Sequence, residues 1–373
     1  MATLLNVFGT LGKLLTPSPA YTDYEYDGLE YRWTIFVFRP ALFKTEAWVT
    51  LAVVIYVLGW YIGKSINGKV ANSWYDAHAD ILAAQFSKPT NGGLTQDGYS
   101  DFFNFSTGRR VVASLHTVFA LRPRHDPFQV IYQFLYGLYD FTYSPSDIVT
   151  LDFKLHPTTS APEGVFAVVR KEELKTIKRE RWDLTFTKTT DHKALSPTLS
   201  VMSEFADISE NLFKEYGTFS LIKTLNDPKT LPYFISLSIT DQPAERPTLP
   251  LLPEEREKHV IVKFSVPSGS QVEDTKEFVT SLFQLVDIVG VKLGNGLRPD
   301  TKNKMRKIRE DLDKQLKTEA TKEQKEEADD AKRVAKRRQE EERVSRLSAA
   351  EQQKIIERDR KRAMRKAQKV VRK

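Results

Sequence analysis

The side chains whose chemistry is clearest are the Lys and Arg residues grouped near the C-terminus. Residues 332–373 contain 17 Lys and Arg against 6 Asp and Glu, with no aromatic residue, Gly or Pro. The cationic candidates are Lys332, Arg333, Lys336, Arg337, Arg338, Arg358, Arg360, Lys361, Arg362, Arg365, Lys366 and Lys369. Such clusters neutralise phosphates rather than read bases, through a salt-sensitive and largely sequence-independent attraction. They predict a polyphosphate or an anionic surface as the partner.

Residue types that could catalyse a reaction or hold a metal are dispersed. None of the six histidines belongs to an HExxH or paired-ligand spacing: His78, His116, His125, His156, His192 and His259. There is no Cys, which excludes disulfides, thiolate metal sites and a Cys nucleophile. The sequence also lacks a Walker loop, a dinucleotide fingerprint and a GxSxG elbow. We therefore expect no enzymatic activity, cofactor or metal.

One stretch is long and apolar enough to cross a membrane. Residues 47–63 contain no charged side chain, and with residues 41–43 the stretch reaches the ~20 residues that a bilayer core requires. Trp48 stands at one end and Trp60 and Tyr61 at the other, as in an interfacial aromatic belt. The stretch begins too far along the chain for an ordinary signal peptide. A buried core helix is the alternative.

The orientation of this span is not decided by its flanking charges, because basic residues lie on both sides. A Cys-free body with a basic tail favours a cytosolic C-terminus and a lumenal N-terminus. The sequon Asn104-Phe105-Ser106 is then expected to carry no glycan. Residues 4–15 place their apolar side chains on one helical face, which fits an interfacial helix or a helix packed on another surface.

The middle of the chain alternates between strand and helix patterns. Strands are expected at 111–121, 148–155, 165–170, 234–240 and 260–266, and helices at 171–181, from 203 or 207 to 217, and at 272–289. Asp126 and Pro127 begin a further helix whose apolar face holds Phe128, Ile131, Phe134, Leu135 and Leu138. The span should continue as a helix to before Pro89, bent near Gly63 and Gly68. This order predicts an α+β fold, a sheet with helices on one side.

A long charged helix is expected after a break at residues 293–300. Nothing interrupts a helix over the last seventy-three residues, ~110 Å at 1.5 Å per residue. Residues 301–331 are balanced, with nine basic and nine acidic side chains. An apolar stripe should dock on the body or on a partner helix: Met305, Ile308, Leu312 and Leu316. Later apolar positions are too sparse for a self-associating zipper, and a bend near 344–350 would fold the tail into a pair.

Four parts are therefore expected: a short N-terminal lumenal segment (1–40), a transmembrane helix (41–63), a cytosolic α+β domain (64–297) and a basic helical coiled-coil tail (298–373). On a chain anchored by a membrane helix, ribosomal RNA at the membrane surface is the polyphosphate that fits best. Anionic lipid is the rival, since it attracts Lys and Arg at ~1 kcal/mol each near the surface. A solvated helix without a partner and a membrane-anchored enzyme are the remaining alternatives.

Four segments, taken in order, resemble those of one protein family. They are WYDAHADILAAQF (74–86), GVFAVVRKEELKTIKRERWDL (164–184), LSPTLSVMSEFADISENLF (195–213) and HVIVKFSVPSGS (259–270). A long Lys/Arg/Glu helix then follows, as in that family. The sequence resembles the calumin family, the coiled-coil-domain subunit of the PAT complex (protein associated with the translocon), in a short, fungal-type form.

The resemblance implies a single-span protein of the endoplasmic reticulum with its body in the cytosol. Members join the multipass translocon and, with the small membrane protein Asterix, shield nascent membrane helices that carry polar groups. The cationic candidates would then face the ribosome. The membrane- and partner-facing candidates are Trp48, Val53, Ile55, Leu58, Trp60, Tyr61, Trp74 and His78. Nascent multi-pass proteins and membrane lipid complete the expected partners.

Two features differ from the animal members, which carry a signal peptide and a long acidic lumenal segment linked to calcium binding. Here about 40 residues precede the span, and residues 21–30 contain four acidic side chains. We therefore expect no calcium buffering, and a span that itself directs insertion with the N-terminus in the lumen.

Overall fold

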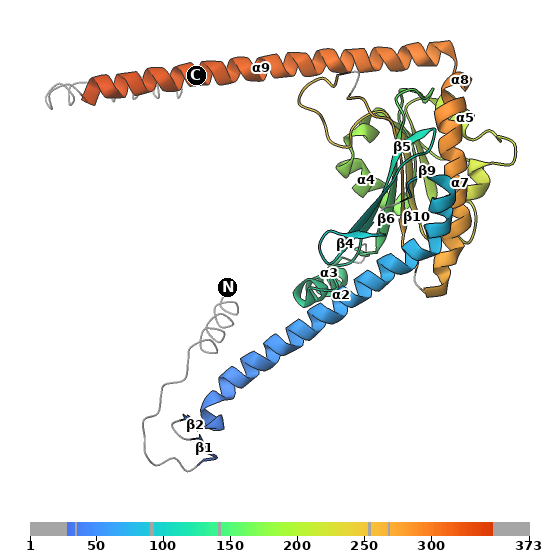
Figure 1. Ribbon diagram of the computed structural model, residues 1–373. Helices are drawn as coiled ribbons and strands as arrows, with labels where there is room; N and C mark the ends of the chain where they lie inside the picture. The colour runs from blue at the N-terminus through green and yellow to red at the C-terminus, as the bar shows by residue number, and fades with distance from the viewer. Residues whose placement is uncertain are drawn as a thin grey trace. The chain divides into compact units, whose positions relative to one another are not determined.

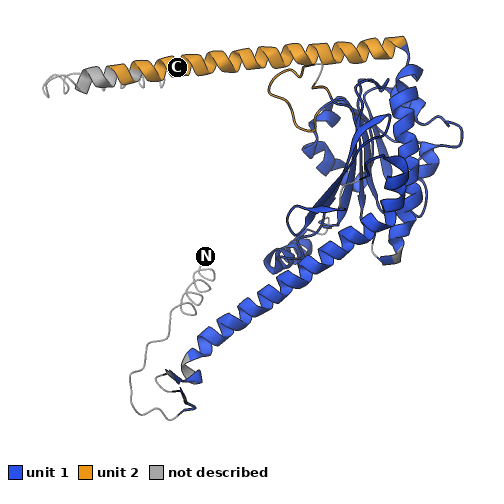
Figure 2. Cartoon of the chain, viewed as in Figure 1, with its two compact units in different colours: residues 1–242, 257–298 blue, residues 243–256, 299–373 orange. Residues whose placement is uncertain are grey.

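The computed structural model describes residues 28–33, 36–89, 93–140, 143–252, 255–267 and 269–345, so the amphipathic stretch at 4–15 lies outside the described residues. The chain divides into two units (Figure 2). Residues 1–242 and 257–298 form the first unit, and residues 243–256 and 299–373 form the second.

One long helix of the first unit passes from the apolar stretch into the body. Helix α2 (Lys44–Gln85) runs for 42 residues without interruption (Figure 1). The strands β1 (Tyr31–Trp33) and β2 (Phe36–Phe38) and the 3-10 turn η1 (Pro40–Phe43) precede it. The predicted helix is confirmed, and it stays α-helical through Gly63 and Gly68, where a bend is expected. Gly63 makes a close backbone contact with another segment of the body.

The body is built on a nine-stranded antiparallel sheet, which confirms the α+β class. The strands in spatial order are β3 (Thr95–Gln96), β4 (Asp101–Ser106), β5 (Val112–Ala120), β6 (Ile148–Leu155), β11 (His259–Ser265), β10 (Phe234–Thr240), β7 (Phe166–Arg170), β9 (Leu199–Ser203) and β8 (Lys188–Thr190). The five predicted strands are present, each within one residue at its ends. Strands β3, β4, β8 and β9 are not predicted from the sequence.

An aromatic core covers one face of the sheet, beneath α2 and α7 (Thr275–Ile288). The ring of Trp74 on α2 lies 5.4 Å from Phe119 and 5.8 Å from Phe264. Phe278 on α7 contacts the same Phe264 ring at 5.8 Å and Phe234 at 6.2 Å. The C-terminal half of α2 is therefore part of the domain core.

The opposite face is also covered, which corrects the expectation of helices on one side. Ile235 follows Phe234 on β10 and therefore points the other way. It belongs to a second buried cluster with Val165, Ala167, Val169 and Met202, closed by Ile177 of α4 (Leu174–Glu180) and Leu184 of the 3-10 turn η3 (Trp182–Phe186). A strand covered on both faces is buried at every position, as β10 is, and its polar members Ser236, Ser238 and Thr240 are buried with the apolar ones.

Shorter elements complete the first unit. They are α3 (Pro127–Tyr139), η2 (Lys171–Glu173), α5 (Ala206–Leu212), α6 (Leu221–Leu225), η4 (Gly269–Asp274), the π-turn η5 (Val289–Leu293) and α8 (Gly294–Gly296). The helix predicted at 272–289 is confirmed as α7. The one predicted at 171–181 is divided between η2 and α4, and the one predicted to reach Gly217 ends earlier, as α5.

The second unit consists of α9 (Pro299–Ser345) and the proline-rich segment 243–256. Two ion pairs join them: Arg246 to Glu319 at 2.7 Å and Arg256 to Asp313 at 2.5 Å. The predicted apolar stripe is covered, with Met305 and Leu316 buried and Ile308 and Leu312 half-buried. The region expected to bend, 344–350, lies almost entirely outside the described residues.

Candidate membrane interface and cationic tail

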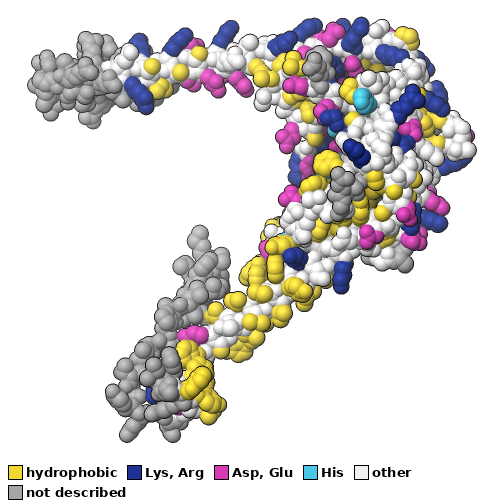
Figure 3. Space-filling model, in the orientation of Figure 1, with side chains coloured by type: hydrophobic (Ala, Val, Ile, Leu, Met, Phe, Trp, Pro, Cys, Tyr) yellow, Lys and Arg dark blue, Asp and Glu magenta, His cyan; other side chains and the backbone are white. Residues whose placement is uncertain are grey.

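The N-terminal half of α2 exposes an apolar surface. In the described part of the chain, α2 is the one helix long and apolar enough to cross a membrane, and only 6% of its most apolar window is buried. Five of the predicted membrane-facing side chains are 55–68% exposed: Trp48, Val53, Ile55, Leu58 and Tyr61. Figure 3 shows the hydrophobic side chains along this part of α2. The core helix of a soluble domain would bury such a surface, so the alternative of a core helix fails here.

Aromatic side chains gather where α2 begins. Tyr31, Trp33 and Phe38 of the β1–β2 hairpin are exposed, and the Phe38 ring stacks on Phe43 with centroids 5.5 Å apart. Trp and Tyr rings at the end of a span are typical of the water–lipid interface, because each ring has an apolar body and a polar edge. The hairpin therefore extends the aromatic belt that Trp48 predicts.

A second aromatic group marks the other end of the apolar stretch. Trp60, which is half-buried, meets Tyr99 edge-on with ring centroids 5.4 Å apart. The ammonium of Lys64 lies 4.9 Å from the Tyr99 ring and 5.5 Å from the Trp60 ring, a cation–π arrangement. Lys64 is the first charge after residues 47–63, so this group lies where α2 leaves the apolar region.

The segment 122–127 crosses α2 in backbone contact. A Cβ atom added to Gly63 would stand 1.9 Å from the carbonyl oxygen of Arg124 and 2.6 Å from the amide nitrogen of His125. Only glycine allows the two backbones to approach this closely. The glycine thus fixes where the body meets the end of the span.

Asn67, one turn further along α2, bonds the body to the helix. Its buried amide donates to the carbonyl oxygens of Tyr99 and Arg122, each at 3.0 Å, and its oxygen accepts from the Arg124 guanidinium at 3.0 Å. Arg124 in turn pairs with Asp147 at 2.7 Å. These bonds satisfy every polar atom of the Asn67 side chain and hold the crossing segment in place.

Helix α3 follows this crossing and lies beside α2. Asp126 caps it, accepting from the amide nitrogens of Phe128 (3.0 Å) and Gln129 (3.4 Å), as the sequence predicts. The Phe128 ring lies 5.4 Å from Tyr56, inside the apolar stretch of α2. The sequence predicts an apolar face for this helix, and none of the α3 residues is buried.

Trp74 and His78 occupy the domain core, which corrects their assignment as partner-facing residues. They are 1% and 0% exposed, and their rings stack 3.9 Å apart. The His78 Nδ1 lies 2.8 Å from the Trp74 carbonyl oxygen and its Nε2 lies 3.1 Å from the Thr275 hydroxyl. Burial lowers the pKa of His78. The chain's own residues therefore surround both side chains.

The cationic candidates fall partly within α9. Lys332, Arg333, Lys336 and Arg338 are exposed, with ion-pair distances of 3.9 Å from Lys332 to Asp329 and 3.6 Å from Arg333 to Asp330. The backbone of Arg337 belongs to the same helix. The remaining candidates lie outside the described residues: Arg358, Arg360, Lys361, Arg362, Arg365, Lys366 and Lys369.

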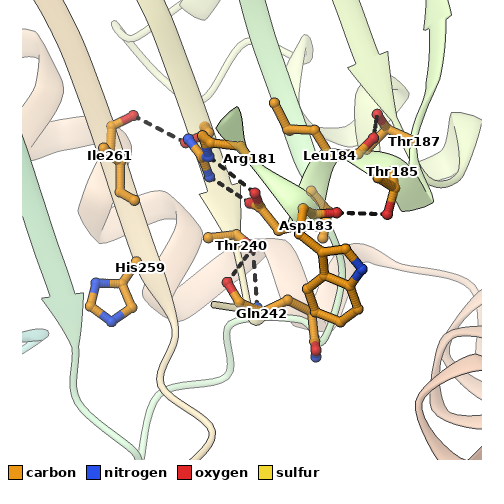
Figure 4. A network of polar contacts seen from close by, with 12 residues as sticks. Arg181, Asp183, Leu184, Thr185, Thr187, Thr240, Gln242, His259 and Ile261 are labelled. Carbon is orange, nitrogen blue, oxygen red and sulfur yellow. Dashed lines mark hydrogen bonds and ion pairs between the residues drawn. The ribbon is translucent and has the colours of Figure 1, made fainter. Parts of the chain in front are cut away.

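Two buried charges of the body, Arg181 and Asp183, are paired with each other. The Arg181 guanidinium donates to both carboxylate oxygens of Asp183, at 3.0 and 2.5 Å, and to the Ser238 hydroxyl at 2.6 Å (Figure 4). Such an arrangement holds η3 against β10 rather than presenting a reactive group. Among the described residues, no group of three or more His, Asp or Glu side chains could hold a metal ion.

A half-exposed ionic cluster joins β6 to β11. His259 contacts Asp152 at 2.7 Å through Nδ1 and Glu257 at 3.3 Å through Nε2, and Lys154 pairs with Glu257 at 2.5 Å. Burial lowers the pKa of His259, but the two carboxylates outweigh it and the net shift is upward. Lys154 lowers the pKa of Glu257. Mutual pairing accounts for both shifts.

A comparison with known protein families identifies the family to which these features belong. The family model for "PAT complex subunit CCDC47" matches residues 42–366, from the start of the apolar helix deep into the basic tail. The chain belongs to this family. The resemblance inferred from the sequence is thereby confirmed, and membership in the CCDC47 family implies a translocon-associated role in membrane-protein biogenesis.

Two relatives of this CCDC47-family chain come from a fungus and a plant. The chain is 27% identical over 350 residues to the UPF0674 endoplasmic reticulum membrane protein of Schizosaccharomyces pombe, covering 88% of this chain and 89% of that protein. It is 22% identical over 252 residues to an uncharacterized protein of Arabidopsis thaliana, covering 64% of this chain and 49% of that protein. The fungal relative thus matches the chain in length as well as in order.

Three features of this CCDC47-family chain were not recognised in the sequence: the aromatic β1–β2 hairpin, the contact at Gly63 and the exposure of α3. A signal existed for α3, because its thirteen residues contain no charge. The contact at Gly63 depends on a segment distant in the sequence, Arg124 and His125, so no local pattern could reveal it.

Proposed function

We propose that this chain is a non-catalytic scaffold and cochaperone of the multipass translocon in the endoplasmic reticulum membrane. It assists the insertion and folding of multi-pass proteins together with a small, Asterix-like membrane partner. The observation that carries this proposal is the family match over residues 42–366, which includes the span, the body and most of the basic tail. The printed description of the fungal relative as an endoplasmic reticulum membrane protein supports the location.

The division of labour follows the four parts expected from the sequence. Residues 41–63 cross the bilayer with residues 1–40 in the lumen, residues 64–297 form the cytosolic domain, and residues 298–373 form the tail. The small partner and client helices meet the exposed side of the span, near Val53, Ile55 and Leu58. We expect a protease added to intact microsomes to remove a C-terminal epitope and to spare an N-terminal one. The opposite pattern would contradict this topology.

The tail binds the translating ribosome through phosphate neutralisation. Support comes from the charge distribution, since residues 301–331 are balanced and the excess of 17 bases over 6 acids lies in residues 332–373. A contact of this kind weakens as salt rises, because each neutralised phosphate releases counterions. Membrane anchoring by α2 would keep this cationic end close to the ribosomes that dock at the same membrane.

Co-sedimentation of detergent-solubilised protein with ribosomes tests this function. The full chain is compared with a chain ending at Ala331 across a salt series, and loss of a salt-sensitive association on truncation is the expected result. A charge-matched pair of triple variants refines the test. Replacing Lys336, Arg337 and Arg338 by Gln should weaken binding, whereas replacing three exposed bases of the balanced segment by Gln should not: Lys317, Lys322 and Lys325.

The rival function is a membrane tether whose tail binds anionic lipid, which rests on the same cationic residues. Flotation with vesicles that contain phosphatidylserine measures binding of the tail to anionic lipid, and it distinguishes the scaffold function from the tether function. Salt-sensitive binding to ribosomes, but not to these vesicles, supports the scaffold. Binding to vesicles without ribosome association would replace the scaffold by the tether, and equal sedimentation of both chain lengths would move the ribosome contact out of the tail.

A further inference from the structure

Helix α3 exposes an apolar surface to solvent. Its sequence, PFQVIYQFLYGLY, contains no charged residue, and six large side chains are 56–72% exposed: Phe128, Ile131, Tyr132, Phe134, Leu135 and Leu138. The solvent-facing side of an ordinary surface helix is charged or polar, whereas this helix has no charge and, besides its tyrosine hydroxyls, two glutamines as polar groups. An apolar patch of this kind marks a contact with something equally apolar.

The position of α3 indicates what that contact is. Phe128 packs on Tyr56, and a Cβ atom on Gly59 would stand 2.9 Å from Cγ of Pro127, so α3 starts against the apolar stretch of α2. Tyr56 precedes Lys64 by eight residues, ~12 Å along a helix at 1.5 Å per residue. An interfacial helix buries its apolar face ~5–10 Å into the boundary between headgroups and acyl chains, and the start of α3 lies at a comparable distance from Lys64. Whatever solvates α2 at Tyr56 also meets α3.

The ends and the tyrosines of α3 also suit a lipid environment. Unpaired backbone groups are costly in hydrocarbon, and here the Asp126 carboxylate and Pro127, which has no N–H, satisfy the N-terminal turn. The amide nitrogen of Asp140 donates to the Tyr136 carbonyl oxygen at 2.8 Å at the other end. Tyr132, Tyr136 and Tyr139 have an apolar ring and a polar tip, the combination favoured at headgroup level.

We propose that α3 is a second membrane element, inserted without crossing into the leaflet that faces the domain, where it contacts lipid acyl chains beside α2. The body is then held to the bilayer at two points, and the backbone contact at Gly63 fixes the angle between them. A surface built for a second copy or a soluble partner would not need to be continuous with a membrane span. This inference depends on α2 crossing the bilayer and is independent of any ribosome contact by the tail.

Site-specific labelling of the full chain in phosphatidylcholine vesicles tests the inference. The chain has no Cys, so one introduced Cys carries a unique fluorophore. Phe134→Cys and Leu138→Cys report on α3, Leu58→Cys provides the reference in the span, and Val291→Cys, 52% exposed on the body, provides the reference in water. Nitroxide on the lipid acyl chains should quench both α3 labels several-fold more than the label at 291, and aqueous iodide should quench them several-fold less.

The result that overturns the inference is equally specific. If the labels at 134 and 138 respond to iodide as the label at 291 does, α3 lies in water. If neither quencher reaches them while the label at 58 is quenched from the lipid, protein covers α3 instead, and a second copy is the occupant in this purified system. Unchanged tryptophan emission in the labelled variants guards against misfolding, and agreement between two α3 positions guards against a local artefact.

Discussion

Replacing Gly63 by Ala should detach the crossing segment from α2. The new Cβ would stand 1.9 Å from the Arg124 carbonyl oxygen, whereas ordinary contacts begin at 3.4 Å, so this backbone must retreat by about 1.5 Å. The neighbouring bonds of Asn67 to Arg122 and Tyr99, each 3.0 Å, do not survive a shift of that size. A buried amide would then be left without partners.

The expected free-energy change follows from three contributions. Overpacking against backbone costs ~1–3 kcal/mol. Leaving the Asn67 amide unsatisfied costs a further ~1–3 kcal/mol. Alanine recovers ~1 kcal/mol relative to glycine inside a helix, so Gly63→Ala should lower the free energy of unfolding by about 1–5 kcal/mol. Gly68→Ala provides the matched control, since nothing lies within 4 Å of its added Cβ. That variant should be neutral or stabilised by up to ~1 kcal/mol.

Thermal and denaturant unfolding of the full chain in detergent micelles, followed by tryptophan fluorescence, measures this difference. Trp60 reports locally, because its ring contacts Tyr99 at the crossing, and Trp74 reports from the core. The Gly63 variant should unfold at lower temperature than the Gly68 variant, with a change in total tryptophan emission, to which Trp60 contributes, before the main transition. If the two variants unfold alike, the close approach of 122–127 to α2 does not exist, and the two-point attachment loses its basis.

Three further outcomes are expected. Asp183→Ala leaves the Arg181 guanidinium buried without its partner and should cost about 3–5 kcal/mol in chemical denaturation, whereas Asp191→Ala at an exposed pair with Lys171 should change stability far less. Because the pKa of His259 is raised in the fold, its stabilising contribution is complete below the unfolded value of 6.5 and is lost as pH rises through the folded pKa. The stability deficit of His259→Gln should therefore shrink as pH rises above 6.5. In microsomes, Asn104→Gln should leave the gel mobility unchanged, because Asn104 is buried and bonded to the Gly93 carbonyl oxygen; faster migration would reveal a glycan.

The parts of the fold that could be predicted are those with a strong local pattern. On β6, Val149, Leu151, Phe153 and Leu155 alternate with half-exposed residues, and the strand lies where that alternation places it. Strand β4 was missed because its inward positions include polar side chains. Asn104 and Ser106 are buried there, and each is satisfied by a loop carbonyl, of Gly93 and of Pro89. A pattern read as hydrophobicity cannot register a polar residue whose partner comes from elsewhere.

The candidate site also has a part that could be predicted from a local pattern and a part that could not. The exposed half of α2 is recognisable from seventeen residues without charge, and the structure leaves that half uncovered. The helical pattern continues past Lys64 to Trp74 and His78, where the surroundings change from open surface to sheet. The charges after residue 63 mark the end of the apolar stretch but not the surface that the helix then meets. For α3 the reverse holds, because its sequence shows an apolar face but not which surface it meets.

The continuity of α2 has a mechanical consequence. Its first half is exposed and apolar, its second half contributes Trp74 to the aromatic core, and no flexible joint separates them. A helix bends sharply at a proline, a Gly/Ser pair, a π-bulge or an inserted group; α2 contains no proline or π-turn and stays α-helical through Gly63 and Ser65. The domain therefore cannot pivot freely on its span, and the crossing at Gly63 removes rotation about the helix axis as well. For a non-catalytic scaffold this rigidity is the useful property, because a displacement of the body by a bound partner is transmitted to the membrane surface of the span, where client helices would be met.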